Sequence, residues 1–535
     1  MVAMGQTENF ADAIRGGQTA LGIELGSTRI KACLTDHTGT TLASGGYEWE
    51  NSLVDGLWSY PIEQVHEGLR AAYADLAANV TAAHGMTLEK VGAIGVSAMM
   101  HGYLAFDAQG DLLVPFRTWR NVNTERAAAK LSGELDFNIP LRWSVAHLFE
   151  AVLGREEHVA SISHINTLAG YVHEKLTGER VLGVGDASGV FPIDPATGTY
   201  DAARLAKTDA LLAEAGAPHL TLANVLPVVK RAGESAGVLT EAGAALLDTT
   251  GSLQAGAIAA APEGDAGTGM VATNAVLPRT GNVSAGTSFF SMVVLEKPLT
   301  TRHEEIDIVT TPAGDLVAMV HCNNGASELG AWAGVFREFA VALGSSASAD
   351  DVFGALLSGA LTPGADDGIL AYNHLSGEPI AGLPEGRPLI VRTPSSTLSL
   401  AGLMRAQVRG SFATLSLGMR ALADEGVQID EMHAHGGVFR TAGVAQRLLA
   451  AALGAPVVVG ETASEGGAWG MAVLAAYTLS ASDQPLHAWL DETIFAGSET
   501  SRVTPTADDI ADHAAYLDRW ADGLAIERTA VATTR

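Results

Sequence analysis

The stretch Gly22-Ile-Glu-Leu-Gly-Ser-Thr-Arg-Ile-Lys31 decides the fold. Its apolar runs, Leu21–Ile23 and Ile30–Leu34, flank a Gly/Ser/Thr turn, and this pattern predicts a β-hairpin. A second hairpin is predicted at 282–294, and its turn lies in Gly281-Asn-Val-Ser-Ala-Gly-Thr-Ser288. Because each half of the chain opens on the same pattern, we predict one α/β architecture used twice.

The segments around the two hairpins alternate between strand and helix patterns. A third strand is predicted at 41–47 and a buried strand at 91–97. Helices are predicted at 62–83, 328–343, 403–423 and 442–452, with a peripheral helix at 507–530. With 535 residues, the chain is too long for a single core. We predict a loose leader at 1–19, an N-terminal lobe at 20–275, a C-terminal lobe at 276–480 and a helical extension at 481–535.

Composition excludes several classes of protein. The net charge of −28 disfavours binding to nucleic acid and to anionic membranes. No uncharged apolar run reaches the roughly 18 residues of a membrane helix, and residues 1–20 do not have the pattern of a signal peptide. Cys33 and Cys322 are the only cysteines, so we expect no disulfide framework and a cytoplasmic location.

Several segments together resemble the FGGY family of carbohydrate kinases, and the resemblance runs from about residue 20 to 480. They are the two hairpin turns, Glu263-Gly-Asp-Ala-Gly-Thr-Gly269, Gly368-Ile-Leu-Ala-Tyr-Asn-His-Leu-Ser-Gly-Glu378, His435-Gly-Gly-Val438 and Glu465-Gly-Gly-Ala-Trp-Gly-Met-Ala472. The resemblance implies a two-lobed actin-like ATPase (ribonuclease H-like) fold. ATP, Mg²⁺ and a small sugar would bind in the cleft between the lobes, and a homodimer is possible.

Asp265 is the candidate general base. A sugar hydroxyl is a poor nucleophile, and a carboxylate within hydrogen-bond reach can accept its proton as the bond to phosphorus forms. Gly264, Gly267 and Gly269 would let substrate and phosphate approach closely. Asp265 could instead cap a helix that starts at Thr268. Both roles are compatible, since a helix N-terminus also favours a phosphate nearby.

The two hairpin turns are candidate phosphate contacts. Gly26, Ser27 and Thr28 in one lobe, and Gly286, Thr287 and Ser288 in the other, can aim backbone and hydroxyl donors at the terminal phosphates. An ordinary tight turn is the alternative in each case. The chain has no Gly-x4-Gly-Lys-Ser/Thr phosphate loop.

Two further positions are assigned to the nucleotide and its metal ion. Gly436 and Gly437 follow a predicted strand at 431–435, where adenine or ribose could lie against bare backbone. Glu24 replaces the Asp that is usual in the family, and its carboxylate could hold Mg²⁺ directly or through water. A structural acid in the hairpin is the alternative for Glu24, and Lys31 is expected to face solvent or a carboxylate.

Candidate sugar contacts follow the strand predicted at 91–97. Met100, His101 and Gly102 resemble the Gln-Met-His-Gly segment of xylulokinases, with Met99 in place of Gln. Trp119 could stack on the sugar, and Arg120 and Asn121 could bind hydroxyls, although core packing is as plausible for Trp119. The segment 185–188 could line the cleft, but Asp186 more often occupies a turn.

These residues favour ATP-dependent phosphorylation of a sugar hydroxyl, with a ketopentose such as xylulose as the first candidate. Ribulose, a deoxyhexulose or a polyol are alternatives. A different class is an actin-like ATPase or a sugar-binding regulator without kinase activity. No basic DNA-binding segment and no β-rich peptide-binding appendage supports that class.

Overall fold

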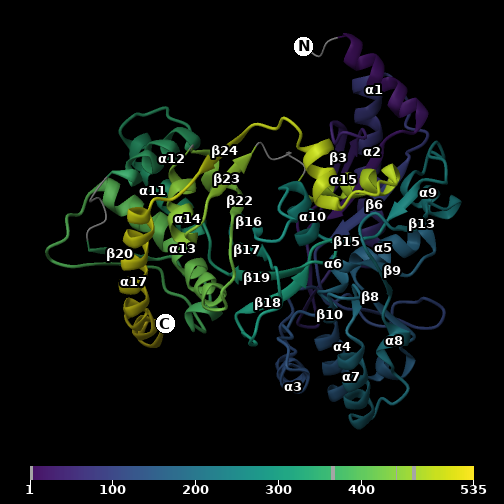
Figure 1. The fold of residues 1–535 in the computed structure, drawn as a ribbon, viewed down its shortest axis with the longest axis horizontal. Helices are drawn as coiled ribbons and strands as arrows, with labels where there is room; N and C mark the ends of the chain where they lie inside the picture. The colour runs from purple at the N-terminus through teal and green to yellow at the C-terminus, as the bar shows by residue number, and fades with distance from the viewer. Residues whose placement is uncertain (1–3, 363–367, 442, 461–465, 535) are drawn as a thin grey trace. The chain divides into compact units, whose positions relative to one another are not determined.

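The computed structural model describes residues 4–362, 368–441, 443–460 and 466–534, which divide into two compact units (Figure 1). Unit 1 contains the chain up to residue 276, together with 308–317 and 462–497. Unit 2 contains 277–307, 318–461 and 498–535. The predicted division at 275/276 coincides with the first of these boundaries. The segment 466–497, which the prediction divides between the C-terminal lobe and the extension, packs with unit 1.

A seven-stranded sheet forms the centre of unit 1, in the order β13-β14-β6-β1-β2-β3 with β15 beside β6. The predicted hairpin is confirmed, because β1 and β2 pair antiparallel, while β6 runs parallel to β1. The bounds are β1 Ala20–Leu25, β2 Arg29–Thr35, β3 Thr41–Glu48, β6 Ala93–Ala98, β13 Ser235–Val238, β14 Ile258–Ala260 and β15 Glu263–Gly264.

The sheet that contains the unit 2 hairpin repeats this arrangement, in the order β18-β19-β17-β16-β22-β23-β24. In both sheets the first strand of the hairpin lies between its antiparallel partner and a parallel strand, so the predicted repetition is confirmed. The bounds are β16 Thr280–Ala285, β17 Phe289–Val294, β18 Ile306–Thr310, β19 Leu316–Cys322, β22 Glu431–His435, β23 Val457–Gly460 and β24 Thr500–Val503.

Helices and small two-stranded sheets surround the central sheet of unit 1. The leader predicted to be loose contains a helix, α1, and Ile14 near its end is only 2% exposed, because an apolar contact orders this otherwise polar segment. The helices are α1 Met4–Gly16, α2 Ile62–His84, α3 Glu125–Leu135, α4 Ser144–Gly154, α5 Leu168–Thr177, α6 Val184–Ala187, α7 Ala202–Glu214, α8 Leu222–Val225, α9 Glu241–Leu247, α10 Asp265–Ala272, α15 Gly467–Ser480 and α16 Leu486–Trp489. The short strands are β4 Ser52–Val54, β5 Leu57–Ser59, β7 Leu104–Phe106, β8 His164–Asn166, β9 Val181–Gly183, β10 Ile193–Asp194, β11 Thr199–Tyr200 and β12 Val228–Lys230.

Helix α15 comes from the last fifth of the chain and covers the sheet that contains β1 (Figure 1). The approach is close enough to require glycine, since a Cβ on Gly22 would lie 2.1 Å from the carbonyl oxygen of Ala468. The indole Nε1 of Trp469 donates to the carbonyl of Gly39 at 2.7 Å. These contacts tie α15 to unit 1.

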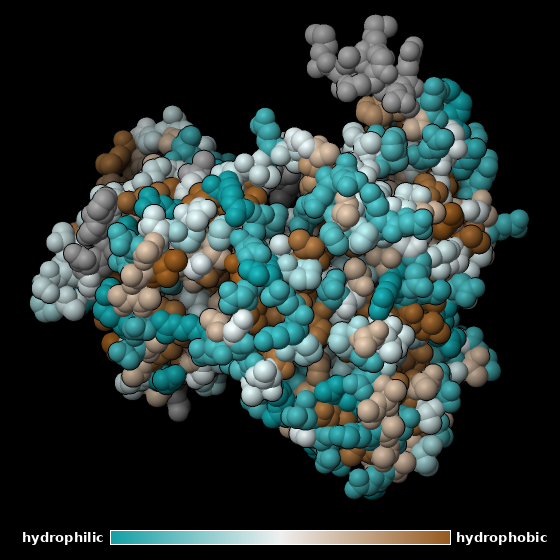
Figure 2. Space-filling model, in the orientation of Figure 1, coloured by the Kyte–Doolittle hydropathy of each residue, from teal (hydrophilic) through white to brown (hydrophobic). Residues whose placement is uncertain are grey.

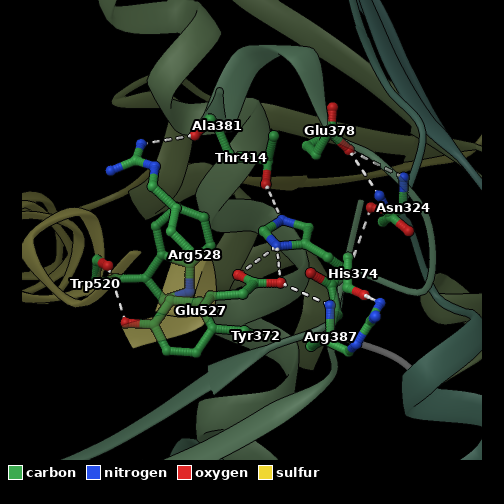
Figure 3. A network of polar contacts seen from close by, with 12 residues as sticks. Asn324, Tyr372, His374, Glu378, Ala381, Arg387, Thr414, Trp520, Glu527 and Arg528 are labelled. Atoms are coloured by element: carbon green, nitrogen blue, oxygen red, sulfur yellow. Dashed lines mark hydrogen bonds and ion pairs between the residues drawn. The ribbon is translucent and has the colours of Figure 1, made fainter. Parts of the chain in front are cut away.

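The long helix α17 (Ala507–Thr533) is part of the core of unit 2, so the predicted peripheral position is wrong. Figure 3 shows its contacts with the strand β20 (Ile369–Tyr372) and the residues that follow it. Trp520 Nε1 donates to the carbonyl of Ala371 at 2.9 Å, and the ring nitrogen Nδ1 of His374 lies 2.8 Å from a carboxylate oxygen of Glu527. Both side chains of this ion pair are fully buried. One face of α17 thus packs in the core, and the exposed residues lie on its other face.

Further helices of unit 2 confirm the predicted segments. They are α11 Ser327–Ala342, α13 Leu400–Asp424 and α14 Val444–Leu453. The helix α12 (Ala349–Ser358) was not predicted, and β21 (Leu389–Arg392) pairs with β20. Figure 2 shows that hydrophilic side chains cover much of the face drawn, with hydrophobic ones scattered among them. Among the described helices, none has the length and apolarity that crossing a membrane requires.

Candidate active site

Parallel strand pairing gathers the predicted unit 1 residues at one sheet edge. Leu25, at the end of β1, is paired with Ala98 at the end of β6, and Gly264 of β15 is paired with the same residue. The turn 26–28, the segment 99–102 and Asp265 therefore follow strands that end side by side. Ligands of α/β sheets usually bind outside the carboxyl ends of such strands.

Asp265 is the first residue of α10 and remains partly accessible. Its Oδ1 accepts a hydrogen bond from the amide of Met100 at 3.2 Å. Burial raises the pKa of Asp265, although hydrogen bonds from backbone amides oppose the shift. The helix begins three residues before the predicted start at Thr268, and Gly264 occupies the capping position. A carboxylate with a raised pKa is better matched to proton acceptance than an ordinary one.

His101 is held in an uncommon backbone conformation close to Asp265. Its φ is +68°, and its side chain is only 4% exposed. Nδ1 lies 3.1 Å from the carbonyl oxygen of Gly189. Because a carbonyl can only accept, the neutral ring carries its proton on Nδ1, which makes Nε2 the acceptor. The ring can therefore accept a hydrogen bond from a hydroxyl.

The neighbours of His101 leave little spare volume. Met100 is 6% exposed and packs over Gly264, where a Cβ would lie 2.1 Å from the methionine Cγ. Gly102 has φ +94°, and a Cβ there would lie 2.8 Å from the carbonyl of Arg117. The predicted Met-His-Gly segment is thus a tightly packed wall beside Asp265.

The three residues of the Trp119 segment have different roles. The Trp119 side chain is not packed in the core, because it is 36% exposed and its Nε1 donates to Ser27 Oγ at 3.3 Å. Arg120 lies over the Trp58 ring at 4.2 Å. Asn121 is buried and bonds the Trp58 carbonyl (2.8 Å) and amide (2.8 Å) and the Thr118 carbonyl (3.1 Å). Asn121 therefore holds the loop, and its predicted contact with a sugar hydroxyl is corrected.

Two aromatic residues hold the turn at Gly26, Ser27 and Thr28. Trp49 Nε1 donates to the Gly26 carbonyl at 2.7 Å, and the Tyr60 hydroxyl donates to the Ser27 carbonyl at 2.6 Å. The two rings stack with their centroids 4.2 Å apart. This clamp fixes the turn independently of any ligand.

Glu24 is placed at the start of α15. A Cβ on Gly467 would lie 2.3 Å from its Oε1, and the same point lies 3.1 Å from Thr268 Oγ1. Lys31 Nζ is 3.9 Å from Glu24 Oε2, which confirms that Lys31 faces a carboxylate. Among the described residues, no three His, Cys, Asp or Glu side chains form a metal-binding group. The donor set fits an ion held mainly by phosphates and water, with one carboxylate nearby.

In unit 2, the predicted phosphate turn follows β16, and the Gly436–Gly437 turn follows β22. These two strands pair in parallel up to Ser284 and His435, so the two turns begin side by side. Gly436 has φ +124°, and a Cβ there would lie 2.1 Å from the carbonyl of Ala285. The carbonyls of Gly286 and Thr287 accept bonds from the amides of Ala326 and Gly325, at 2.9 and 2.8 Å. Gly436 is thus required for packing, whereas nothing lies within 4 Å of a Cβ on Gly437.

Two buried carboxyl groups lie near Asp265, and neither was assigned a part in the reaction from the sequence alone. Asp186 and Glu263 are each 1% exposed. The amide of Asp186 donates to Glu263 at 3.0 Å, and that of Gly185 does so at 3.4 Å. Asp186 was expected in a turn, but it lies in α6, where the contact with Glu263 buries it. The sequence signals were the proximity of Glu263 to Asp265 and the prediction that the segment 185–188 could line the cleft.

Comparison with known proteins defines the class to which this fold and site belong. Residues 19–250 match the N-terminal domain of the FGGY family of carbohydrate kinases, and 281–479 match its C-terminal domain. The chain therefore belongs to this family, with the actin-like two-domain fold of its members, and it is a carbohydrate kinase that acts on a small sugar.

Solved structures with the same fold include kinases named for different substrates. A xyloylose kinase from Brucella ovis is 22% identical, with a TM-score of 0.75, over 94% of this chain and 98% of that one. A gluconate kinase from Lactobacillus acidophilus is 16% identical, with a TM-score of 0.77, over 96% and 98%. A xylulose kinase from Rhodospirillum rubrum is 19% identical, with a TM-score of 0.75, over 95% and 98%. At these identities the likeness establishes the fold alone.

Proposed function

We propose that this kinase transfers the γ-phosphoryl group of ATP to a hydroxyl of a ketopentose such as xylulose, with Asp265 as the general base. The observation that carries the proposal is the position of Asp265. Its carboxylate begins α10, accepts the Met100 amide at 3.2 Å and stands beside the buried His101. The raised pKa of Asp265 supports the same role.

Each group of residues has a part in this reaction. His101 accepts a hydrogen bond from one sugar hydroxyl, and Trp119 offers an exposed ring face to the sugar. Asp265 takes the proton of the attacking hydroxyl while the bond to phosphorus forms. The turns at 26–28 and 286–288 hold the phosphates, and Gly437 lies against the nucleoside. Glu24 would lie near a Mg²⁺ ion bound with the phosphates, and such an ion would neutralise phosphate charge.

An ADP-release assay tests the proposal. The panel contains xylulose, ribulose, a deoxyhexulose, gluconate and glycerol, each with MgATP. We expect stimulation by a ketopentose, and a loss of roughly 10²- to 10⁴-fold in Asp265→Asn, because a general base contributes that much. Stimulation by another sugar alone would reassign the substrate. If ATP is hydrolysed without sugar, and at the same rate in Asp265→Asn, the proposed role of Asp265 as the base is refuted and an actin-like ATPase is favoured.

A further inference from the structure

Asp186 is a fully enclosed carboxyl group for which the reaction described above has no use. Its Oδ2 accepts a hydrogen bond from the hydroxyl of Thr167 at 2.6 Å. Its Oδ1 has no hydrogen-bond partner among the described residues. A buried acceptor without a partner is costly, so its presence calls for a physical explanation.

The unpartnered oxygen is directed at the residue that precedes the base. Asp186 Oδ1 lies 3.4 Å from the point where a Cβ of Gly264 would stand. The amide of Asp186 also binds Glu263, so α6 is tied to the strand that leads into Asp265. Asp186 thus stands directly behind the base, with its position fixed through Thr167 on one side and Glu263 on the other.

The neighbouring charge that acts on Asp186 is that of an acidic residue, Asp265. Burial, and then the charge of Asp265, raise the pKa of Asp186 to about 7. Burial, and then the charge of Asp186, raise the pKa of Glu263 to about 8. Tyr200 faces the group from β11, and burial followed by the Asp186 charge raises its pKa. Like charges in one pocket do not ionise together readily, so protonation of one member favours ionisation of another.

We propose that Asp186 is a positioning residue for Asp265, and that it retains the proton that allows Asp265 to be ionised in the same enclosed pocket. When Asp186 loses this proton, its charge makes Asp265 a stronger base, and the repulsion is relieved as Asp265 accepts the sugar proton. The inference rests on the proposed function, because it takes Asp265 as the base.

The test compares pH profiles of kcat/KM for the most active sugar of the panel. In the wild type we expect an inflection near pH 7, above which the rate rises by up to about tenfold, the effect of coupling by about one pKa unit. In Asp186→Asn the inflection should be absent. In Thr167→Val it should move to higher pH, because the hydrogen bond that favours the ionised form is lost, whereas Thr167→Ser should keep it in place.

A second measurement does not depend on activity. Infrared difference spectra of the wild type should contain two protonated carboxyl bands, one from Asp186 that titrates near pH 7 and one from Glu263 that titrates near pH 8. Only one band should remain in Asp186→Asn, and it should titrate at lower pH than the Glu263 band of the wild type, because the Asp186 charge is gone. Asp248→Asn is the matched control, because Asp248 is a buried carboxylate of the same unit whose oxygens bind the loop at 250–253. Neither the bands nor the inflection should change in that control.

The outcomes separate the two hypotheses. A wild-type profile without the inflection, or an Asp186→Asn profile that is lower but parallel to the wild type, would overturn the positioning role while Asp265→Asn remains inactive. If Asp265→Asn is as active as the wild type, the proposed base itself fails. Should Asp186→Asn not fold, the comparison of Thr167→Val with Thr167→Ser decides the same question.

Discussion

The packing of α15 against α10 should control the position of the base. Gly470 of α15 faces the backbone of α10, and a Cβ there would lie 2.2 Å from the carbonyl oxygen of Thr268. Carbon and oxygen atoms rarely approach within about 3.3 Å. Gly470→Ala therefore requires the two backbones to separate by about 1 Å. Since α10 begins at Asp265, its carboxylate moves with the helix.

Two effects of Gly470→Ala are expected. Overpacking should lower the free energy of unfolding by about 1–3 kcal/mol. A displacement of about 1 Å at the base should lower kcat by about 10²-fold. Urea unfolding measures the first effect, and ADP release by the folded enzyme at saturating sugar and MgATP measures the second.

Gly133→Ala is the matched control for this prediction. Gly133 lies in α3, and nothing is within 4 Å of a Cβ at that position. We expect this variant to gain about 0.5–1 kcal/mol of stability, with kcat unchanged. If Gly470→Ala loses stability but keeps kcat within twofold of the wild type, the link between helix packing and the base is refuted. If neither quantity changes, the close backbone approach is wrong.

Three further predictions concern buried polar groups. The pKa of Glu263 is raised from 4.5 to about 8, so the stability it contributes is present below pH 4.5 and lost as the pH rises through 8. As the pH rises from 5 to 9, the free energy of unfolding of Glu263→Gln, measured in urea, should therefore gain up to about 5 kcal/mol relative to that of the wild type. If the difference between the two proteins does not change with pH, the raised pKa of Glu263 is contradicted. Glu527→Ala should lower the free energy of unfolding, measured by thermal unfolding, by about 3–5 kcal/mol, because it leaves the buried His374 without its carboxylate partner. Glu527→Gln should lower it less. Equal losses in the two variants would contradict the importance of the buried pair. Asn121→Ala should lose about 1–3 kcal/mol in urea unfolding with KM for the sugar unchanged, and a raised KM without loss of stability would restore the sugar contact.

Much of the architecture could be predicted from the sequence. Strands and helices depend on periodicity and turn chemistry, which act between near neighbours in the chain. The Gly/Ser/Thr turns after Leu25 and Ala285 therefore predicted both hairpins, and each one appears in the structure. The repetition of this pattern predicted two units of one design. The Gly-rich surroundings of Asp265 marked it as the candidate base; in the structure its Oδ1 accepts the Met100 amide, and the catalytic role stays a proposal.

Only the tertiary structure decided which residues are enclosed and which surfaces meet. Asp186 resembled a turn residue, yet its amide binds Glu263, 77 positions away, and its side chain is buried. Asn121 was predicted to bind a sugar hydroxyl, but its side-chain amide donates to the backbone carbonyl of Trp58. Helix α15 packs on Gly22, more than 400 positions earlier. Burial and desolvation arise from contacts between residues that are distant in the chain, so they cannot be predicted from the local sequence pattern.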